Sequence, residues 1–306
     1  MLAFIAPGQG AQTPGMLAPW ITDPAAKLLL SHWSHEIDLD LVRLGTTADS
    51  DEIKDTANAQ PLIVAAGLLG ARALGSARLA IVAGHSVGEI TAAAIAGVID
   101  DVDAMKLVRA RGIEMAKAAA LKPAGMAAVL GGDREVVLRA ISDLGLVAAN
   151  DNGGGQIVAA GDLDALAQLA PEGARVRALA VAGAFHTSYM QPAVAPLQEI
   201  AAKISVHAAK CPVISNKDGA VLHDGREILD RIVAQISSPV RWDLCITTLA
   251  SHVSGAVEVP PAGTLVGLLK RAVPIIETFA LKTTEDVTLA KEFIVRHIDE
   301  QNDEDK

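Results

Sequence analysis

Residues 81–98 read IVAGHSVGEITAAAIAGV, and this order of apolar, polar and small residues sets the expected fold. An apolar, β-branched run leads into G-H-S-V-G at residues 84–88, and an alanine-rich run follows. The first run predicts a buried strand and the second a helix, so the polar Ser86 falls in the turn between them. A G-x-S-x-G turn from strand to helix is typical of a nucleophilic serine. An ordinary helix N-cap would also fit Ser86, and that alternative stays open on these residues alone.

The glycines and the helix start give this turn its expected chemistry. Glycine has no Cβ, so Gly84 and Gly88 leave space where the strand and the helix crowd the turn. We expect the helix to start at Ser86, which places its free N–H groups and positive dipole end beside the hydroxyl. The backbone N–H of Val87 is then a natural donor to a developing oxyanion.

A nucleophilic serine needs a base, and His186 is the best placed of the eight histidines. The run ALAVAGAFHTSYM predicts a buried strand that ends at His186, followed by a helix from Thr187 or Ser188. Ligands bind at the carboxyl ends of strands in open α/β sheets, so we expect Ser86 and His186 at similar ends of different strands. A core or capping role for His186 stays open. The neighbouring His85 is expected to point away from Ser86.

One arginine falls on a face where a charge is unexpected. A long helix is predicted from Asp101, which we take as its N-cap. Arg111 lies on an otherwise apolar face of this helix, whose other members are Ala104, Val108 and Met115. A buried arginine needs a partner. That partner is either an Asp or Glu in an ion pair, or a substrate carboxylate that the planar guanidinium binds through two hydrogen bonds.

Strands and helices alternate along the chain, which predicts an α/β fold. Between residues 123 and 183 the order changes to β-α-β-β-α-β, the order of a ferredoxin-like unit. We expect this small α+β subdomain to be inserted into a larger one formed by residues 1–122 and 184–282, with NGGGQ as its hairpin turn. A phosphate-binding loop is the alternative for these glycines, but no helix is predicted directly after them. Residues 283–306 are expected to form an acidic tail that carries a helical stretch and has a solvated, disordered end.

Composition limits the class of protein further. The 306 residues are 51% hydrophobic but only 3% aromatic, which suits helices packed on a parallel sheet buried on both faces. The net charge of −10 argues against general nucleic-acid binding. Cys211 and Cys245 are too few for a disulfide framework or a zinc site. Neither a signal peptide nor an apolar run of bilayer length is apparent, so we expect a cytoplasmic monomer that binds no membrane.

Motifs along almost the whole chain resemble the malonyl-CoA:acyl-carrier-protein transacylases of bacterial fatty-acid synthesis, particularly the actinobacterial form. The matching stretches are APGQGAQ, AQPLIVAA, AGHSVGE, RARGIEMA, GMAAVLGG, ANDNGGGQIVAAG, GAFHTSYM and PPAGTLVGLLKR. Many members have GPG where this chain has PPAG. The resemblance implies an α/β-hydrolase-like large subdomain with a mostly parallel sheet, beside the ferredoxin-like small one.

The resemblance also implies roles for individual residues. It matches Ser86 to the nucleophile, His186 to the base, Arg111 to the carboxylate-binding arginine, Gln9 to an oxyanion donor through its backbone N–H, and Gln60 to the acyl pocket. Further residues expected at the substrate are Val87, Met115, Phe185, Asn150 and Asn152. The two asparagines either contact pantetheine or serve only the hairpin. A main-chain carbonyl, expected near Ser251, orients the histidine.

The implied reaction is ping-pong transfer of malonyl from malonyl-CoA, through a malonyl-serine ester, to the phosphopantetheine thiol of acyl carrier protein. It needs no metal and no other cofactor. A serine esterase or thioesterase of the α/β-hydrolase type is the alternative, although no HGGG-type loop and no acidic partner are evident. A non-catalytic docking module is a weaker alternative. A basic rim for the acidic carrier protein is expected from Lys106, Arg109, Lys117, Lys122, Lys270 and Arg271.

Overall fold

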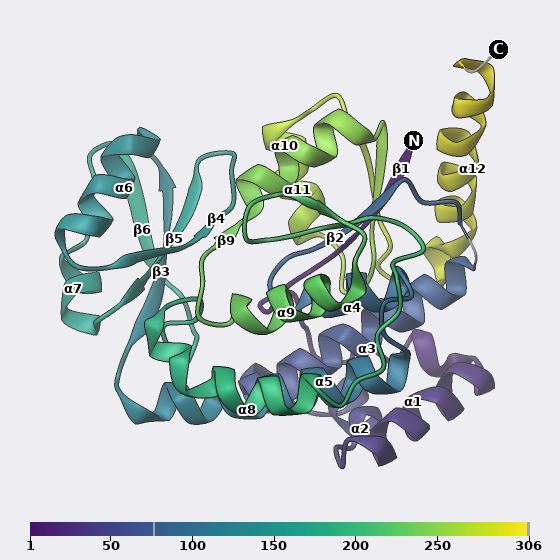
Figure 1. Ribbon diagram of the computed structural model, residues 1–306, viewed down its shortest axis with the longest axis horizontal. Helices are drawn as coiled ribbons and strands as arrows, with labels where there is room; N and C mark the ends of the chain where they lie inside the picture. Colours follow the sequence, from purple (N-terminus) through teal and green to yellow (C-terminus); the bar gives the residue numbers. More distant parts are fainter. Residues whose placement is uncertain (76, 305–306) are drawn as a thin grey trace.

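A computed structural model describes residues 1–75 and 77–304. It contains two sheets that lie beside each other, each with its own helices (Figure 1). The larger sheet has the strand order β11-β10-β1-β2-β7-β8, and only its β7–β8 pair is antiparallel. Its strands are β1 Leu2–Ala6, β2 Ile81–Gly84, β7 Val213–Ile214, β8 Val221–Leu222, β10 Gly255–Glu258 and β11 Glu277–Ala280. The mostly parallel sheet expected from the sequence is therefore present.

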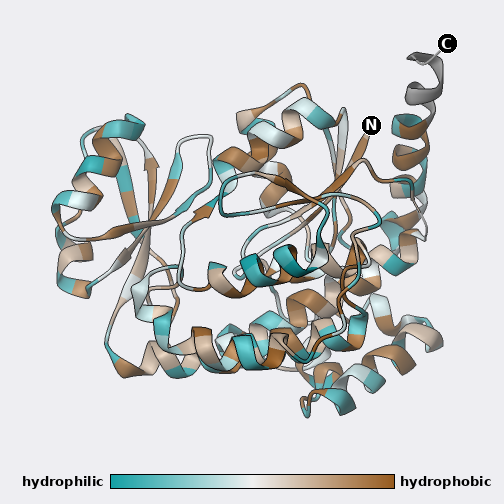
Figure 2. Ribbon diagram, in the orientation of Figure 1, coloured by the Kyte–Doolittle hydropathy of each residue, from teal (hydrophilic) through white to brown (hydrophobic). Residues whose placement is uncertain are grey.

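The larger sheet is buried on both faces, as alternation along β1 illustrates. Phe4 packs into one cluster with the helices α3, α4 and α5, whereas Ala3 and Ile5 pack into another with α10 and α11. Figure 2 shows these strands as largely hydrophobic. The helices around this sheet are α1 Pro24–Glu36, α2 Leu41–Thr46, α3 Thr56–Leu74, α4 Gly88–Ile95, α5 Asp101–Leu121, α8 Gln191–Ala201, α9 Gly225–Gln235, α10 Trp242–His252, α11 Thr264–Ala272 and α12 Val287–Glu304. No helix among the described residues has the length and hydropathy that a membrane span requires.

The smaller sheet has the strand order β6-β3-β5-β4-β9. Its elements follow the chain as β3 Gly125–Gly131, α6 Arg134–Asp143, β4 Val147–Asp151, β5 Gln156–Gly161, α7 Leu163–Gln168 and β6 Ala174–Ala178. The fifth strand, β9 (Val240–Arg241), comes from much later in the chain and pairs in parallel with β4. This strand is not predicted by the sequence, because two residues carry no periodic signal.

The two faces of the small sheet have different neighbours. Ile157 and Ala159 of β5 pack in a separate cluster with α6. Val158 and Ala160, which alternate with them, belong to the main core cluster instead. The face without helices therefore turns toward the large sheet, and this places it over the end of β2.

Three local predictions need correction. Asp100, not Asp101, is the N-cap of α5, because its side chain accepts the Asp103 N–H at 2.7 Å. The strand before His186 ends early: β6 stops at Ala178, at the edge of the small sheet. The helical stretch expected after Thr283 is present as α12 with Phe293 buried against the core, but the helix continues to Glu304, where a disordered end was expected. Residues 305 and 306 lie outside the described residues.

Candidate active site

Ser86 lies in a tight turn between β2 and α4. Its φ of 54° is in the left-handed region, which residues other than glycine adopt rarely. A Cβ on Gly84 would lie 2.0 Å from the Gly88 carbonyl, and a Cβ on Gly88 would lie 2.2 Å from the Ala6 oxygen. Both glycines are therefore required by close approach of the backbone. The helix begins at Gly88 and not at Ser86 as expected.

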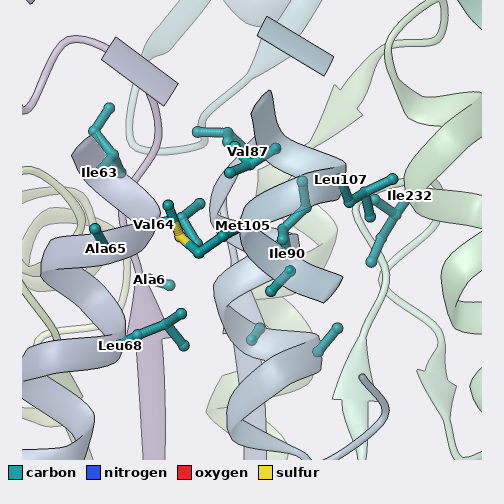
Figure 3. Packing of buried hydrophobic residues seen from close by; sticks show 14 of the residues in the cluster. Ala6, Ile63, Val64, Ala65, Leu68, Val87, Ile90, Met105, Leu107 and Ile232 are labelled. Carbon is teal, nitrogen blue, oxygen red and sulfur yellow. The ribbon is translucent and has the colours of Figure 1, made fainter. Parts of the chain in front are cut away.

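Apolar packing and hydrogen bonds both hold the Ser86 turn in place. The Val87 side chain is fully buried and lies near Ile90 in the packing between α3, α4 and α5 (Figure 3). The Ser86 N–H donates to Asn216 Oδ1 at 2.8 Å, and Asn216 Nδ2 donates to the Gly84 carbonyl at 2.7 Å. Because Ser86 N–H has this partner, it is not free to act as an oxyanion donor.

His186 stands within hydrogen-bonding distance of the serine. Its Nε2 lies 2.7 Å from Ser86 Oγ, and its Nδ1 lies 2.9 Å from the main-chain oxygen of Gln235. A carbonyl only accepts, so Nδ1 carries the hydrogen and Nε2 accepts from the serine hydroxyl. Gln235 is the last residue of α9, where the helix leaves its carbonyls without helical partners. The supporting carbonyl is therefore Gln235 and not one near Ser251, which is exposed on α10.

A loop, not a strand, delivers His186 to this position. After β6 the chain leaves the small sheet, and His186 takes a φ of 61° with its N–H donating to the Ile236 carbonyl at 3.1 Å. The apolar residues before it had resembled a strand, yet they lack a neighbouring strand to pair with. Thr187 caps the following 3-10 turn, Ser188–Met190, at the predicted place. Burial and the Arg111 charge lower the pKa of His186 to about 3, so the imidazole is neutral near pH 7.

Arg111 points inward from α5 and is 1% exposed, as its helical face predicted. Its Nη1 donates to Gln60 Oε1 at 2.7 Å, and its Nη2 donates to Gln235 Oε1 at 2.9 Å and to Ser86 Oγ at 3.2 Å. Its Nε is buried and has no hydrogen-bond partner among the described residues. Ion pairs within the described chain do not include Arg111, so no direct contact with an acid satisfies it. Burial lowers its pKa to about 10, which leaves the guanidinium charged at pH 7.

A cavity opens above Ser86, between the two sheets. Of the predicted site residues it is lined by Gln9, Gln60, Ser86, Arg111, Met115, Asn150, Asn152, Phe185 and His186. Val87 contributes no side chain to the cavity, because that side chain is buried beneath the turn. The backbone N–H groups of Val87 and Gln9 make no hydrogen bond within the described part of the chain. Apolar residues that the sequence analysis did not single out complete the walls, among them Met126, Val158 and Leu268.

The remaining predicted residues connect the turn to the cavity wall. Gln60 Nε2 contacts Gln9 Oε1 at 3.4 Å and Met115 Sδ at 3.5 Å. His85 Nε2 lies 2.8 Å from Asn152 Oδ1, so this histidine joins the serine turn to the small sheet and does not contact Ser86 Oγ. Its ring also packs edge-on against Trp242, with 5.5 Å between ring centroids.

Three polar residues beside the site were also not found from the sequence. Gln235 contacts both His186 and Arg111, Asn216 holds the serine backbone, and Glu89 is buried beside both of them. Glu89 directly follows the G-H-S-V-G motif, and a charge in an alanine-rich helix was a signal that could have been used. Gln235 and Asn216 carry no such local signal, because only the tertiary fold brings them to Ser86.

Comparisons with known proteins agree with this geometry. A family model for the acyl transferase domain matches residues 3–291. A malonyl CoA-acyl carrier protein transacylase of Mycobacterium tuberculosis is 52% identical over 296 residues, covering 94% of this chain and 98% of that protein. One from Escherichia coli is 33% identical over 304 residues, covering 95% of this chain and 98% of its own.

Solved structures extend the similarity to three dimensions. The crystal structure of MCAT from Mycobacterium tuberculosis has a TM-score of 0.91 at 52% identity, covering 94% of this chain and 98% of that one. A malonyl-transacylase in complex with a type II PKS acyl-carrier protein has a TM-score of 0.89 at 30% identity, with coverage of 95% and 99%. The identity over nearly full length, together with the geometry around Ser86, means that this chain belongs to the acyl transferase family and, within it, to the malonyl CoA-acyl carrier protein transacylases.

Proposed function

We propose that this enzyme moves a malonyl group from malonyl-CoA to the phosphopantetheine thiol of an acyl carrier protein, through a malonyl ester of Ser86. The observation that carries the proposal is the position of Ser86 Oγ, 2.7 Å from His186 Nε2 and 3.2 Å from Arg111 Nη2. The neutral base His186 and the buried cation Arg111 thus both contact the oxygen atom of the nucleophile Ser86. The names of the relatives, and the carrier-protein complex among the similar structures, support the same substrates.

The first half-reaction forms the ester. His186 Nε2 takes the hydroxyl proton as Ser86 Oγ bonds to the thioester carbonyl carbon. The resulting oxyanion accepts hydrogen bonds from the backbone N–H groups of Val87 and Gln9, each worth about 3–4 kcal/mol in the transition state. The carbon–sulfur bond then breaks, and the CoA sulfur receives the proton from His186. In the second half-reaction the phosphopantetheine thiol attacks the ester by the same steps, and Ser86 regains its proton.

Arg111 supplies the choice of acyl group in this proposal. The malonyl carboxylate would accept hydrogen bonds from its guanidinium, which is itself buried, and a charged pair is stronger there than in water. The glutamine Gln60 holds the guanidinium from one side and Gln235 from the other. Phe185 and Met115 close the apolar part of the acyl pocket, and Asn150 and Asn152 lie where pantetheine would enter.

The division of the chain supports this arrangement. We infer an α/β-hydrolase-like large subdomain, residues 1–122 and 184–282, and a ferredoxin-like small one, residues 123–183, which also recruits β9. The strand order β6-β3-β5-β4 of the small sheet favours this assignment. We further propose that the enzyme acts in the cytoplasm as a monomer, and that neither a metal nor another cofactor takes part.

Transfer against hydrolysis tests the proposal. The full chain is mixed with malonyl-CoA and a holo acyl carrier protein, and malonyl carrier protein and free malonate are both quantified over time. We expect malonyl carrier protein to be produced over many catalytic turnovers before free malonate accumulates. Malonate as the main product, at a rate that ignores the carrier protein, would instead assign the chain to the serine thioesterase alternative.

A further inference from the structure

Glu89 is a buried carboxylate that the reaction above does not use. It lies in the first turn of α4, three residues after Ser86, and is 3% exposed. One carboxylate oxygen accepts the Asn216 backbone N–H at 2.5 Å, and the other accepts Gln235 Nε2 at 2.6 Å. Burial raises the pKa of Glu89 to about 8, although these two donors and Arg111 act in the opposite direction. Both carboxyl oxygens therefore accept hydrogen bonds from N–H groups of other elements.

The Gln235 amide can take only one orientation in these surroundings. Its Nε2 faces three acceptors, which are Glu89 Oε2 at 2.6 Å, the Ser86 carbonyl at 3.1 Å and Asn216 Oδ1 at 3.1 Å. Its Oε1 faces Arg111 Nη2 at 2.9 Å. A reversed amide would set oxygen against the carboxylate and an NH₂ group against the guanidinium. The Glu89 carboxyl group makes the shortest of the three contacts, so together with the two carbonyl oxygens it directs the Gln235 oxygen at the arginine.

We propose that Glu89 is a positioning residue for acyl-group selection, acting on Arg111 through the side-chain amide of Gln235. This inference rests on the proposed function, in which Arg111 binds the malonyl carboxylate. Through Gln235 the buried carboxylate holds the guanidinium at the place where it meets the acyl group. Asn216 gives it a second link, to the Ser86 backbone.

Replacing the carboxylate by an amide disturbs this link without changing its size. In Glu89→Gln, one end of the new side chain is an NH₂ group, which must face either the Asn216 N–H or Gln235 Nε2. Both of these are donors, so one hydrogen bond of the original side chain is replaced by a contact between two donors, and the Gln235 amide is displaced from the position in which its Oε1 faces Arg111 Nη2. The guanidinium then loses an acceptor and shifts, which weakens binding of a charged acyl group more than that of an uncharged one.

The test compares malonyl-CoA with acetyl-CoA, which has no carboxylate. Formation of the Ser86 ester by each thioester is followed by intact mass in single-turnover experiments on the full chain. The variants are Glu89→Gln, Gln235→Met and the double variant, with Arg111→Ala as reference. Gln235→Met removes the amide but keeps the main-chain carbonyl that holds His186. Glu258→Gln is the matched control, because Glu258 is also buried and accepts backbone N–H groups at the start of α11, without contacting Arg111.

We expect Glu89→Gln and Gln235→Met each to lower the malonyl-to-acetyl ratio of rate constants by about tenfold or more, one tenfold step being 1.36 kcal/mol. The double variant should fall no further than the larger single effect, because both act through one link. Glu258→Gln should leave the ratio unchanged.

Three outcomes overturn the inference. The first is that Glu89→Gln slows both thioesters by the same factor, which is the behaviour of a purely structural residue. The second is that the effects of the two single variants multiply in the double variant. The third applies if Glu89→Gln does not fold. An unchanged malonyl-to-acetyl ratio in Gln235→Met then rejects the inference, because the Gln235 amide would have no effect on Arg111. A tenfold fall of that ratio supports it. If Arg111→Ala itself leaves the ratio unchanged, it is the proposed function that fails.

Discussion

Ser86 and His186 share an unusual backbone conformation, with φ of 54° and 61°, but different parts of the chain hold them there. Ser86 is held by its own neighbours, since Gly84 and Gly88 let β2, β1 and α4 meet closely around it. His186 follows a loop and is held by the end of α9, because its Nδ1 is hydrogen-bonded to the main-chain oxygen of Gln235, 49 residues later in the chain. The nucleophile is thus shaped locally, and the base is placed by tertiary contacts.

This difference predicts two kinds of sensitivity. The serine turn has no room for change, because its closest contacts are backbone atoms that cannot move without breaking the sheet. The histidine loop meets side chains and a helix end, which can shift by small distances. Damage to the turn should therefore remove the fold, whereas damage to the loop should mainly slow the reaction.

Two glycine substitutions test this difference with the largest expected effect. In Gly88→Ala the new Cβ would lie 2.2 Å from the Ala6 oxygen, so we expect a loss of more than about 3 kcal/mol in the free energy of unfolding. In Gly183→Ala, in the histidine loop, it would lie 2.6 Å from Ala119 Cβ, and we expect a loss of about 1–3 kcal/mol with slower acylation. Urea unfolding curves measure both. Equal losses would show that the two regions do not differ in this way.

Arg111 joins the two regions, because Nη2 contacts both Ser86 Oγ and the Gln235 side chain. Arg111→Ala should slow acylation by malonyl-CoA by about 10²-fold, from two charged hydrogen bonds of about 1.5 kcal/mol each. Acylation by acetyl-CoA should change far less, since that group has no carboxylate. Arg111→Lys should restore only part of the rate, because an ammonium lacks the planar pair of donors. Equal losses for both thioesters would make Arg111 a structural residue.

The pH dependence of the acylation rate tests the surroundings of His186. Burial and then the Arg111 charge lower the pKa of His186 to about 3, so the base is neutral at every pH above that value. Acylation by acetyl-CoA, which carries no titrating acyl group, should stay constant from pH 7 down to about pH 5, well below the usual histidine pKa near 6.5. Arg111→Ala removes one cause of the lowering, so its acid limb should move to higher pH. A wild-type rate that halves near pH 6.5 would contradict the buried, neutral imidazole.

The smallest effect is expected at the rim. Lys270 and Arg271 are exposed on α11, which lines the cavity, so reversing their charge should slow transfer to the carrier protein by about threefold and spare ester formation. Lys122 lies 3.3 Å from the hydroxyl of Tyr189, just after His186, and its reversal should slow both steps. Assays of transfer to the carrier protein at low and high salt measure how much of each slowing is electrostatic. Salt-independent slowing would argue against an electrostatic role.

The same difference explains what could be predicted from the sequence. Ser86 and Arg111 were identified because their signals are local: a strand–turn–helix pattern for the serine and helical spacing for the arginine. The burial of Arg111 is confirmed, and none of the ion pairs among residues 1–75 and 77–304 includes it. The predicted strand before His186 was wrong, because apolar residues in a loop that leaves one sheet have the same sequence pattern as a buried strand.

The partner of His186 shows the limit most clearly. The supporting carbonyl was expected near Ser251 but belongs to Gln235. A main-chain oxygen has no sequence signature, and it becomes available here only because α9 ends at that residue. The side-chain oxygen of Gln235 also accepts a hydrogen bond from Arg111, and its side-chain N–H group donates to Glu89, which we propose orients the amide. Such long-range contacts follow from packing of α4 and α9, which no short motif specifies.

Intact mass after mixing with malonyl-CoA alone tests the covalent step on which the proposed mechanism depends. The wild-type chain should gain the mass of one malonyl group, and peptide mapping should place it on Ser86. Ser86→Ala, which keeps the turn and both glycines, should remain folded by circular dichroism and gain no mass. An adduct of equal yield on folded Ser86→Ala would contradict the mechanism, because the acyl group would then be carried by another residue.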